Sequence, residues 1–299
     1  MTTEVTPPEW LDRDAYPFRV AEFEQPAGRM RYVDEGEGPA VVFVHGTPTW
    51  SFLYRRLIRR LAPTHRCIAP DNLGFGLSDK PANAPYTVPF HAENLRRLID
   101  HLGLEKFALV VHDFGGPIGL SQAIETPERI TALVVMNTWL WSSADDKTVR
   151  LVVRMFGGRV GRALYRRFDF TKKVLIPSVF ADKGKYTDVV KRHYQSTTRT
   201  PDERNGEWRY VRELAERNDW YQSYWDRRDA LAGKPMRLVW GMADKVFPEI
   251  YLDRWREAFP EAQVDRLANV GHFVAEEMDD AAIDDVAKFL TEHAAGTGA

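Results

Sequence analysis

The chain has 299 residues, of which 44% are hydrophobic and 12% aromatic, so its composition suits one large globular domain or two small ones. Its 41 basic and 43 acidic residues give a formal net charge of −2, which excludes a strong overall field for gathering nucleic acid or an anionic membrane. The single cysteine, Cys67, cannot form an internal disulfide, and the sequence shows neither a signal peptide nor a membrane-length apolar run. We therefore expect a cytoplasmic protein with no nucleic-acid and no membrane partner.

Short β-branched runs alternate with amphipathic stretches along the chain, which predicts a largely parallel sheet covered by helices on both faces. Two strands that form an antiparallel pair are expected first, at 19–24 and 29–34. Helical spacing of apolar residues predicts helices at 92–102 and 281–290. The remaining strands are expected at the apolar runs 40–45, 66–70, 107–112, 132–136, 236–240 and 263–267.

One interval, 139–234, breaks this alternation because it is rich in arginine, lysine, tyrosine and tryptophan with helical spacing. We interpret it as a helical cap inserted between two strands, at the carboxyl edge where such sheets bind ligands. The chain would then consist of a main domain, 1–138 with 235–299, and a cap domain, 139–234.

The segment 108–119 is an apolar run that ends in a polar residue, Asp113, and continues into small residues that begin a helix. This arrangement is typical of the nucleophile elbow of α/β-hydrolases, although Val111 stands where that motif has glycine. An aspartate is already ionised near neutral pH and can displace a leaving group from an sp³ carbon, forming an ester. The alternative interpretation is that Asp113 only caps the following helix.

Two further residues follow predicted strands in the order expected for a catalytic triad. Asp244 lies just after the run 236–240, and His272 lies in the loop before the last predicted helix. Taken singly, such an aspartate is more often a turn former and such a histidine more often structural. The order nucleophile, acid, histidine is that of the α/β-hydrolase fold, so we predict that Asp113, Asp244 and His272 are catalytic.

The first parallel strand ends in the sequence HGTPTW at 45–50, which supplies the second part of the predicted site. The backbone N–H groups of Thr47 and Phe114 are expected to form an oxyanion hole for the carboxyl oxygen of Asp113. The neighbouring His45 and the glycine-rich turn at 71–79 are expected to be structural.

With these residues in place, the chain resembles the haloalkane dehalogenases, a branch of the α/β-hydrolases. The resemblance covers most of the sequence outside the predicted cap, and members of one subfamily place the acid after the seventh strand, as Asp244 is placed. It implies that Asp113 displaces halide, that His272 activates the water that hydrolyses the ester, and that no cofactor or metal takes part. A small apolar organic molecule is the implied substrate. The matching segments are LDRDAYPF (11–18), HGTPTWSFLY (45–54), APD (69–71), GFGLSDKP (74–81), HDFGG (112–116), VMN (135–137) and GHFV (271–274).

The sequence departs from the family at the position after the nucleophile. The family has tryptophan there, and its indole N–H helps to bind the departing halide, whereas Phe114 has no such donor. A second family donor is an asparagine of the first loop or a tryptophan of the cap. The first loop here has Thr47, and residues 142–207 contain no tryptophan. Candidate replacements in or beside the predicted cap are Trp139, Trp141, Tyr210 and Trp220.

Two other functions remain open from the sequence. An epoxide hydrolase would use the same triad, with cap tyrosines to protonate the leaving oxygen, and would need no halide donor. A ligand-binding protein could keep the scaffold without turnover, since fold does not fix function. The sequence determines neither the substrate nor the oligomeric state.

Overall fold

The computed structural model describes residues 6–296 and contains one eight-stranded sheet with the order β1-β2-β4-β3-β5-β6-β7-β8. The first two strands pair antiparallel with each other, β2 pairs antiparallel with β4, and all later neighbours are parallel. This confirms the expected α/β-hydrolase sheet and its N-terminal antiparallel pair. The strands are β1 (Val20–Gln25), β2 (Gly28–Glu35), β3 (Ala40–Val44), β4 (Arg66–Pro70), β5 (Phe107–His112), β6 (Ile130–Met136), β7 (Met236–Gly241) and β8 (Gln263–Leu267).

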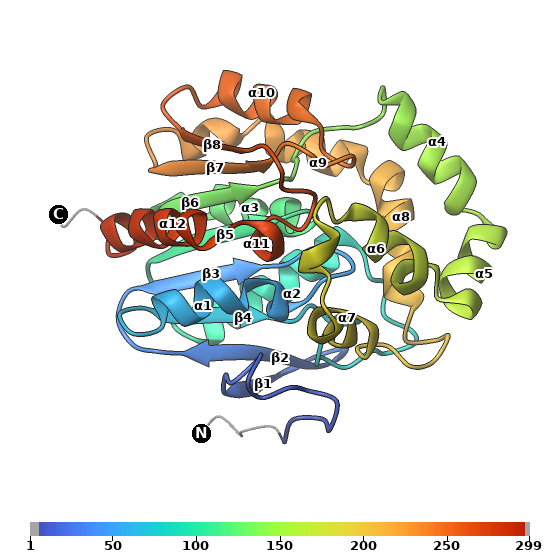
Figure 1. Cartoon of the computed structure of the whole chain (residues 1–299). Helices are drawn as coiled ribbons and strands as arrows, with labels where there is room; N and C mark the ends of the chain where they lie inside the picture. The colour runs from blue at the N-terminus through green and yellow to red at the C-terminus, as the bar shows by residue number, and fades with distance from the viewer. Residues whose placement is uncertain (1–5, 297–299) are drawn as a thin grey trace.

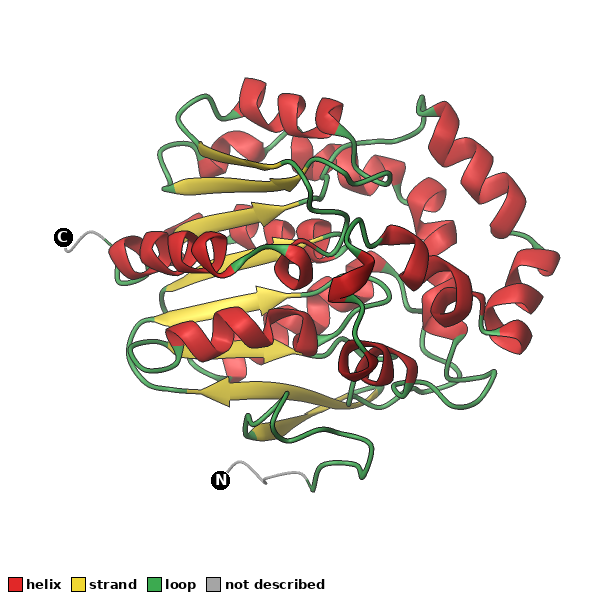
Figure 2. Cartoon of the chain, viewed as in Figure 1, coloured by secondary structure: helices red, strands yellow, loops and turns green. Residues whose placement is uncertain are grey.

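Helices cover both faces of this sheet, as the alternation of strands and amphipathic stretches predicts (Figures 1 and 2). On one face lie α1 (Arg55–Leu61), α11 (Val274–Glu277) and α12 (Asp280–His293), and on the other lie α2 (Val88–His101), α3 (Gly115–Glu125) and α10 (Glu249–Ala258). The predicted helix 92–102 begins earlier, at Val88, because the Thr87 side chain accepts a hydrogen bond from the Phe90 N–H and caps the first turn.

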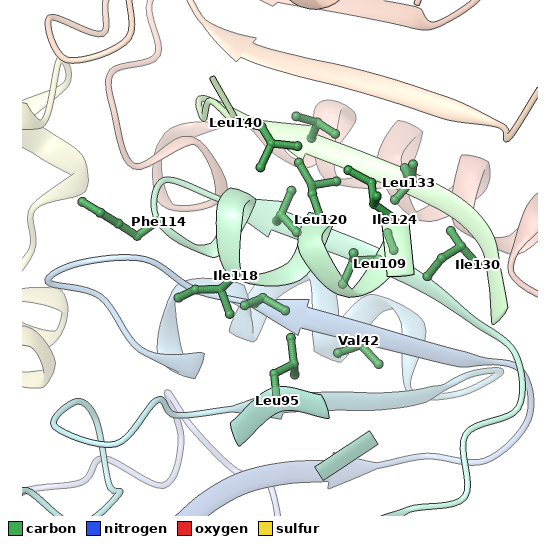
Figure 3. Packing of buried hydrophobic residues seen from close by; sticks show 14 of the residues in the cluster. Val42, Leu95, Leu109, Phe114, Ile118, Leu120, Ile124, Ile130, Leu133 and Leu140 are labelled. Carbon is green, nitrogen blue, oxygen red and sulfur yellow. The ribbon is translucent and has the colours of Figure 1, made fainter. Parts of the chain in front are cut away.

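The two faces of the sheet bury separate hydrophobic clusters, because successive side chains of a strand point to opposite sides. In β5, Leu109 belongs to the cluster under α2 and α3, whereas Val110 belongs to the cluster under α1 and α12. Figure 3 shows Ile118 and Leu120 of α3 packed beside Leu109. Both faces of the central strands β3, β5 and β6 are therefore buried, and only their ends are available for a functional site.

Between β6 and β7, the segment 139–234 contains helices and no strand. Figure 1 shows these helices beyond the carboxyl ends of the parallel strands, with α4 and α5 farthest from the sheet. The helices are α4 (Lys147–Phe156), α5 (Arg159–Phe168), α6 (Ile176–Val179), α7 (Asp188–Gln195), α8 (Asn205–Glu216) and α9 (Asn218–Trp225). Shorter helical turns occupy Ser51–Tyr54, Pro127–Arg129, Thr171–Leu175, Lys183–Lys185 and Arg228–Leu231. Within 6–296, no helix has both the length and the apolar composition needed to cross a bilayer.

Candidate active site

Asp113 lies at the sharp turn between β5 and α3, in a left-handed backbone conformation with φ of 52°. A non-glycine residue adopts this conformation only when its surroundings hold it there, and such strain is typical of functional turns. The Thr138 hydroxyl donates a hydrogen bond to the Asp113 carbonyl oxygen, and the Asp113 N–H donates to the Asn137 carbonyl at 3.1 Å. The end of β6 therefore holds the turn at the end of β5.

Val111 occupies the position where the elbow motif has glycine, and α3 provides the room for it. A Cβ atom at Gly119 would lie 2.8 Å from Cγ1 of Val111, so the missing side chain of Gly119 is what admits the valine. The departure from the motif is thus compensated on the neighbouring helix.

The Asp113 carboxylate is buried and contacts two of the expected partners. Its Oδ1 accepts a hydrogen bond from the Thr47 N–H at 2.7 Å, and its Oδ2 lies 3.7 Å from Nε2 of His272. A Cβ atom at Gly46 would collide with this carboxylate, so the loop before Thr47 approaches it closely. Burial raises the pKa of Asp113 to about 6, against the lowering effects of His272 and of the Phe114 and Thr47 N–H groups.

His272 is held by a carboxylate on its other ring nitrogen. Nδ1 donates to Oδ2 of Asp244 at 2.9 Å, while the Asp244 Oδ1 accepts from the Val246 N–H at 2.7 Å. Burial alone would lower the pKa of His272, but the charge of Asp244 and its hydrogen bond raise it above 6.5. Burial alone would raise the pKa of Asp244, and the same contact with His272 lowers it. The sequence-predicted triad residues therefore lie together at the carboxyl ends of β5, β7 and β8.

Asn137 is a member of this network that the sequence analysis did not assign. Its side-chain Nδ2 donates to Oδ2 of Asp244 at 2.8 Å, and its Oδ1 accepts from the Gly241 N–H at 2.8 Å. It also has a positive φ of 28°. The signal was its place directly after the strand-like run 132–136, but a single asparagine there gives no indication of its partner.

A cavity of about 260 Å³ lies above the Asp113 carboxylate, between the strand ends and the helices of 139–234. Thr47, Phe114 and His272 line it from the sheet side. Most of its other lining side chains are apolar. They come from α4, the helical turn Thr171–Leu175, α6 and α8, and include Val149, Val152, Leu175, Val179, Val211 and Leu214.

Two of the four candidate leaving-group contacts, Trp139 and Tyr210, line this cavity. Both rings pack edge-on against Phe114, with centroid distances of 4.8 Å for Trp139 and 4.4 Å for Tyr210. The indole Nε1 of Trp139 and the hydroxyl of Tyr210 are buried, and neither has a hydrogen-bond partner within residues 6–296. A buried donor without a partner is costly, so these two groups are prepared to bind an acceptor.

The other two candidates lie outside the cavity, which corrects that part of the sequence analysis. Trp141 packs against Trp225 and Trp255 at centroid distances of 4.9 and 5.7 Å, and Trp220 packs against Tyr224 at 4.5 Å. Trp141 thus bridges α9 and α10, whereas Trp220 packs along its own helix, α9, and against the core beneath it, as tryptophans on amphipathic segments commonly do. Helical spacing alone could not distinguish them from Trp139.

The residues expected to be structural are held by the backbone. The Asn72 N–H donates to Nε2 of His45 at 2.9 Å, and Nδ1 of the same ring lies 2.7 Å from the Gly46 carbonyl. Asp71 accepts hydrogen bonds from the Ser51 and Leu77 N–H groups. Across residues 6–296, no three His, Cys, Asp or Glu side chains are grouped so as to hold a metal ion.

Comparison with known proteins gives the same fold and a consistent set of relatives. Residues 39–279 match the family model of the alpha/beta hydrolase fold. "Haloalkane dehalogenase 2" of Mycobacterium tuberculosis is 35% identical over 94% of this chain and 96% of its own length. A cis-3-alkyl-4-alkyloxetan-2-one decarboxylase of Shewanella oneidensis is 34% identical over 92% of this chain and 89% of its own.

The structural comparison agrees. The crystal structure of haloalkane dehalogenase DbeA from Bradyrhizobium elkani superposes with a TM-score of 0.82 at 25% identity, covering 91% of this chain and 97% of that one. The chain therefore belongs to the alpha/beta hydrolase family, within which it is a haloalkane dehalogenase-like hydrolase.

Proposed function

We propose that Asp113 displaces a leaving group from an sp³ carbon of a small apolar substrate, with a halide as the leaving group. The observation that carries this proposal is the Asp113 carboxylate itself, held by the Thr47 N–H at 2.7 Å and open to an apolar cavity. In the first step one carboxylate oxygen bonds to the substrate carbon as the carbon–halogen bond breaks, and the halide takes the electron pair.

In the second step His272 takes a proton from water, and the resulting hydroxide attacks the Asp113 carboxyl carbon. The tetrahedral oxyanion is stabilised by the Thr47 and Phe114 N–H groups, which already act on this carboxylate in the free protein. Collapse restores the Asp113 carboxylate and releases an alcohol. Asp244, positioned by Asn137, stabilises the imidazolium formed on His272.

Phe114 leaves the halide without the family's indole donor, and we assign that role to Trp139 and Tyr210. Both donors are buried, have no hydrogen-bond partner among residues 6–296 and pack around Phe114, so a halide above the Phe114 ring would meet an N–H and an O–H. The apolar lining would otherwise make the release of an anion costly. Trp139, which follows the neighbouring strand β6, would thus supply the indole N–H that Phe114 lacks.

We further propose that 139–234 acts as a cap domain on a main domain of 1–138 and 235–299. Its helices supply a large share of the cavity wall, which supports a role in selecting the substrate.

A second candidate function is the decarboxylation of an oxetan-2-one, which is what the relative in Shewanella oneidensis is named for. Phe114 favours it, because the leaving group is then a carboxylate that stays on the substrate. Asp113 would attack ring carbon C4 and break the C4–O bond. Loss of CO₂ would then break C2–C3, form the C3–C4 double bond and expel Asp113, with no need for water or an external electron acceptor.

The test is intact mass spectrometry of the His272→Ala variant with three substrates of matched chain length, a 1-bromoalkane, a terminal epoxide and an oxetan-2-one. An alkyl adduct on Asp113 from the bromide supports dehalogenation. Alkene and CO₂ from the oxetanone without a stable adduct support the second candidate, and a hydroxyalkyl adduct from the epoxide alone supports epoxide hydrolysis. His101→Ala, a change at an exposed histidine, should turn over like the wild type, and Asp113→Asn should form no adduct.

A further inference from the structure

The outer surface of α4 and α5, which we define as residues 147–174, exposes large hydrophobic side chains. They are distributed over both helices and the turn after them, and each is at least half exposed to solvent. Elsewhere in 6–296 only Ile250 among the large hydrophobic side chains is at least half exposed, while Val189 and Val246 are less so. The side chains are Leu151, Met155, Val160, Phe168 and Val174.

The same 28 residues carry nine arginines and lysines and a single acidic residue, Asp169, in a chain whose total charge is −2. Arg166 pairs with Asp202, and Lys172 is buried beside Asp169. The other seven basic side chains of this surface are exposed, and none of them forms an ion pair within residues 6–296. These seven are Lys147, Arg150, Arg154, Arg159, Arg162, Arg167 and Lys173.

On α4 the two kinds of side chain form adjacent rows. Leu151 and Met155 are four residues apart and lie on one row, and Arg150 and Arg154 form the row beside it. The opposite side of the helix faces inward, where Val149 and Val152 line the cavity. Figure 1 shows that α4 and α5 are the outermost elements on this side of the molecule.

We propose that the α4–α5 surface docks the protein on a bilayer that contains anionic lipids. Guanidinium groups donate paired hydrogen bonds to lipid phosphates, and the apolar side chains enter the boundary between headgroups and acyl chains. The helices lie in the plane of the interface, consistent with the absence, within 6–296, of any helix suited to cross a membrane. The net charge of the whole chain gives no reason to expect a membrane partner. A lipid surface, however, would contact only the α4–α5 surface, which carries a local excess of positive charge.

A second copy of the chain is a poorer occupant of this surface. A two-fold contact would place the same patch on both partners, so the unpaired arginines of one copy would face those of the other. An anionic bilayer instead neutralises them.

Docking would also connect the cavity to the bilayer. Because α4 lines the cavity with one side and would meet lipid with the other, the cavity wall lies about one helix diameter, roughly 10 Å, from the membrane. An apolar substrate dissolved in lipid would then reach Asp113 without crossing water.

The experiment is co-sedimentation of the full-length protein with vesicles of phosphatidylcholine, with and without about 30 mol% phosphatidylglycerol, at low salt and at about 0.5 M NaCl. We expect binding to the anionic vesicles at least about tenfold tighter than to the neutral ones, and loss of most of that difference at high salt.

Two double variants separate the contribution of the positive charges from that of the apolar side chains. Arg150→Gln with Arg154→Gln should weaken binding to anionic vesicles by about tenfold or more, and Leu151→Ser with Met155→Ser should weaken it by a similar factor. The matched controls are Arg60→Gln with Arg97→Gln, which removes the same charge from exposed sites on α1 and α2, and Ile250→Ser on α10. The controls should bind like the wild type, and circular dichroism melts establish that every variant is folded.

Equal binding to neutral and anionic vesicles, or equal losses in the control variants, would overturn the proposal. Binding that tolerates Leu151→Ser with Met155→Ser, together with equally tight binding to a soluble polyanion such as heparin, would indicate a polyanion site instead. Concentration-dependent dimers that Leu151→Ser with Met155→Ser abolishes, without vesicle binding, would assign this surface to a contact between copies.

Discussion

A phenylalanine at position 114 changes what the residues around it must do. The Phe114 ring fills the place beside the nucleophile without offering a donor, and it presents its faces and edges to Trp139 and Tyr210. We propose that the donor that the family carries beside the nucleophile is replaced here by Trp139, after β6, and by Tyr210 on α8. In our proposal the halide site would then be formed by three separate parts of the chain.

Trp139→Phe and Tyr210→Phe should each slow ester formation from a bromoalkane by about 10- to 100-fold, since a hydrogen bond to a charged group contributes about 1.5–3 kcal/mol. Stopped-flow measurement of the first turnover reports this step directly. Trp141→Phe and Trp220→Phe, which lie outside the cavity, should change the rate by less than about threefold. Equal effects in all four variants would assign Trp139 and Tyr210 to packing.

The pH dependence of ester formation should report the ionisation of Asp113. Burial raises its pKa to about 6, and only the carboxylate is nucleophilic, so the rate should fall as the pH drops below about 6. The charge of His272 lowers this pKa, so in His272→Ala the fall should begin at a higher pH. Single-turnover rates across pH 4–9 test both expectations. If the rate of His272→Ala fell at the same pH as that of the wild type, His272 would not lower the pKa of Asp113.

Among the site residues, those that lie in recognisable local sequence patterns could be predicted from the sequence. Asp113, Asp244 and His272 could be named because they follow three predicted strands in the order nucleophile, acid, histidine, and the structure brings them together. Asn137 was not assigned because its importance depends on a hydrogen bond to Asp244, which lies 107 positions away. Trp139 and Trp141 have the same local sequence character, and only packing separates them.

Among the elements, Glu276 on α11 connects three helices. Its carboxylate pairs with Arg55 of α1 at 2.5 Å and accepts a hydrogen bond from the Tyr194 hydroxyl of α7 at 2.9 Å. The Glu276 side chain is 1% exposed, so all of these groups are removed from water together. A helix of 139–234 is thereby joined to the sheet layer near His272.

Glu276→Leu should lower the free energy of unfolding by about 3–5 kcal/mol, because it leaves the Arg55 charge buried without a partner. Glu276→Gln keeps an acceptor for the Tyr194 hydroxyl and should cost less. Urea unfolding measures both, with Asp284→Ala as the control, because the exposed pair of Asp284 with Arg60 should contribute at most about 1 kcal/mol. A loss in the control as large as in Glu276→Leu would contradict this account.

Element boundaries were predictable where a hydrophobic pattern continued along the chain. The strands of the sheet came within a few residues of their observed ends, and α12 contains the predicted 281–290. The helices of 139–234 were predicted only as a group, because their boundaries depend on caps such as Asp146, whose side chain accepts from the Thr148 and Val149 N–H groups.

For the whole molecule, the sheet separates two cores, and Cys67 lies in the one under α1 and α12. Its side chain is fully buried, and burial raises the pKa of its thiol to about 12. Reaction with a thiol reagent therefore requires the core to open.

Cys67 in the native protein should be alkylated by iodoacetamide at least about 10³-fold more slowly than in urea, since the open state is rare for a stable domain. A Ser178→Cys variant carries an exposed second thiol in the same molecule and should gain one adduct quickly. Mass spectrometry counts the adducts, and equal rates for the two thiols would show that the core is open near α1.

The arrangement of the strands and the helices that cover them was the feature most readily predicted from the sequence. Alternating apolar runs and amphipathic helices leave few ways to bury both faces of a parallel sheet, and connections between parallel strands are almost always right-handed. The cavity was not predictable, because its shape follows from how α4, α5 and α8 sit over the strand ends. That placement depends on contacts between residues distant in the sequence.

The strands that flank 139–234 are direct neighbours in the sheet, with Met136 of β6 opposite Val239 of β7. The segment thus leaves and re-enters the sheet at adjacent positions, and the entropy of closing such a loop grows only slowly with its length. These helices can therefore be lengthened, shortened or replaced while the strands stay as they are. If 139–234 selects the substrate, as we propose, exchanging this segment between relatives is a direct route to chimeric enzymes with new substrate ranges.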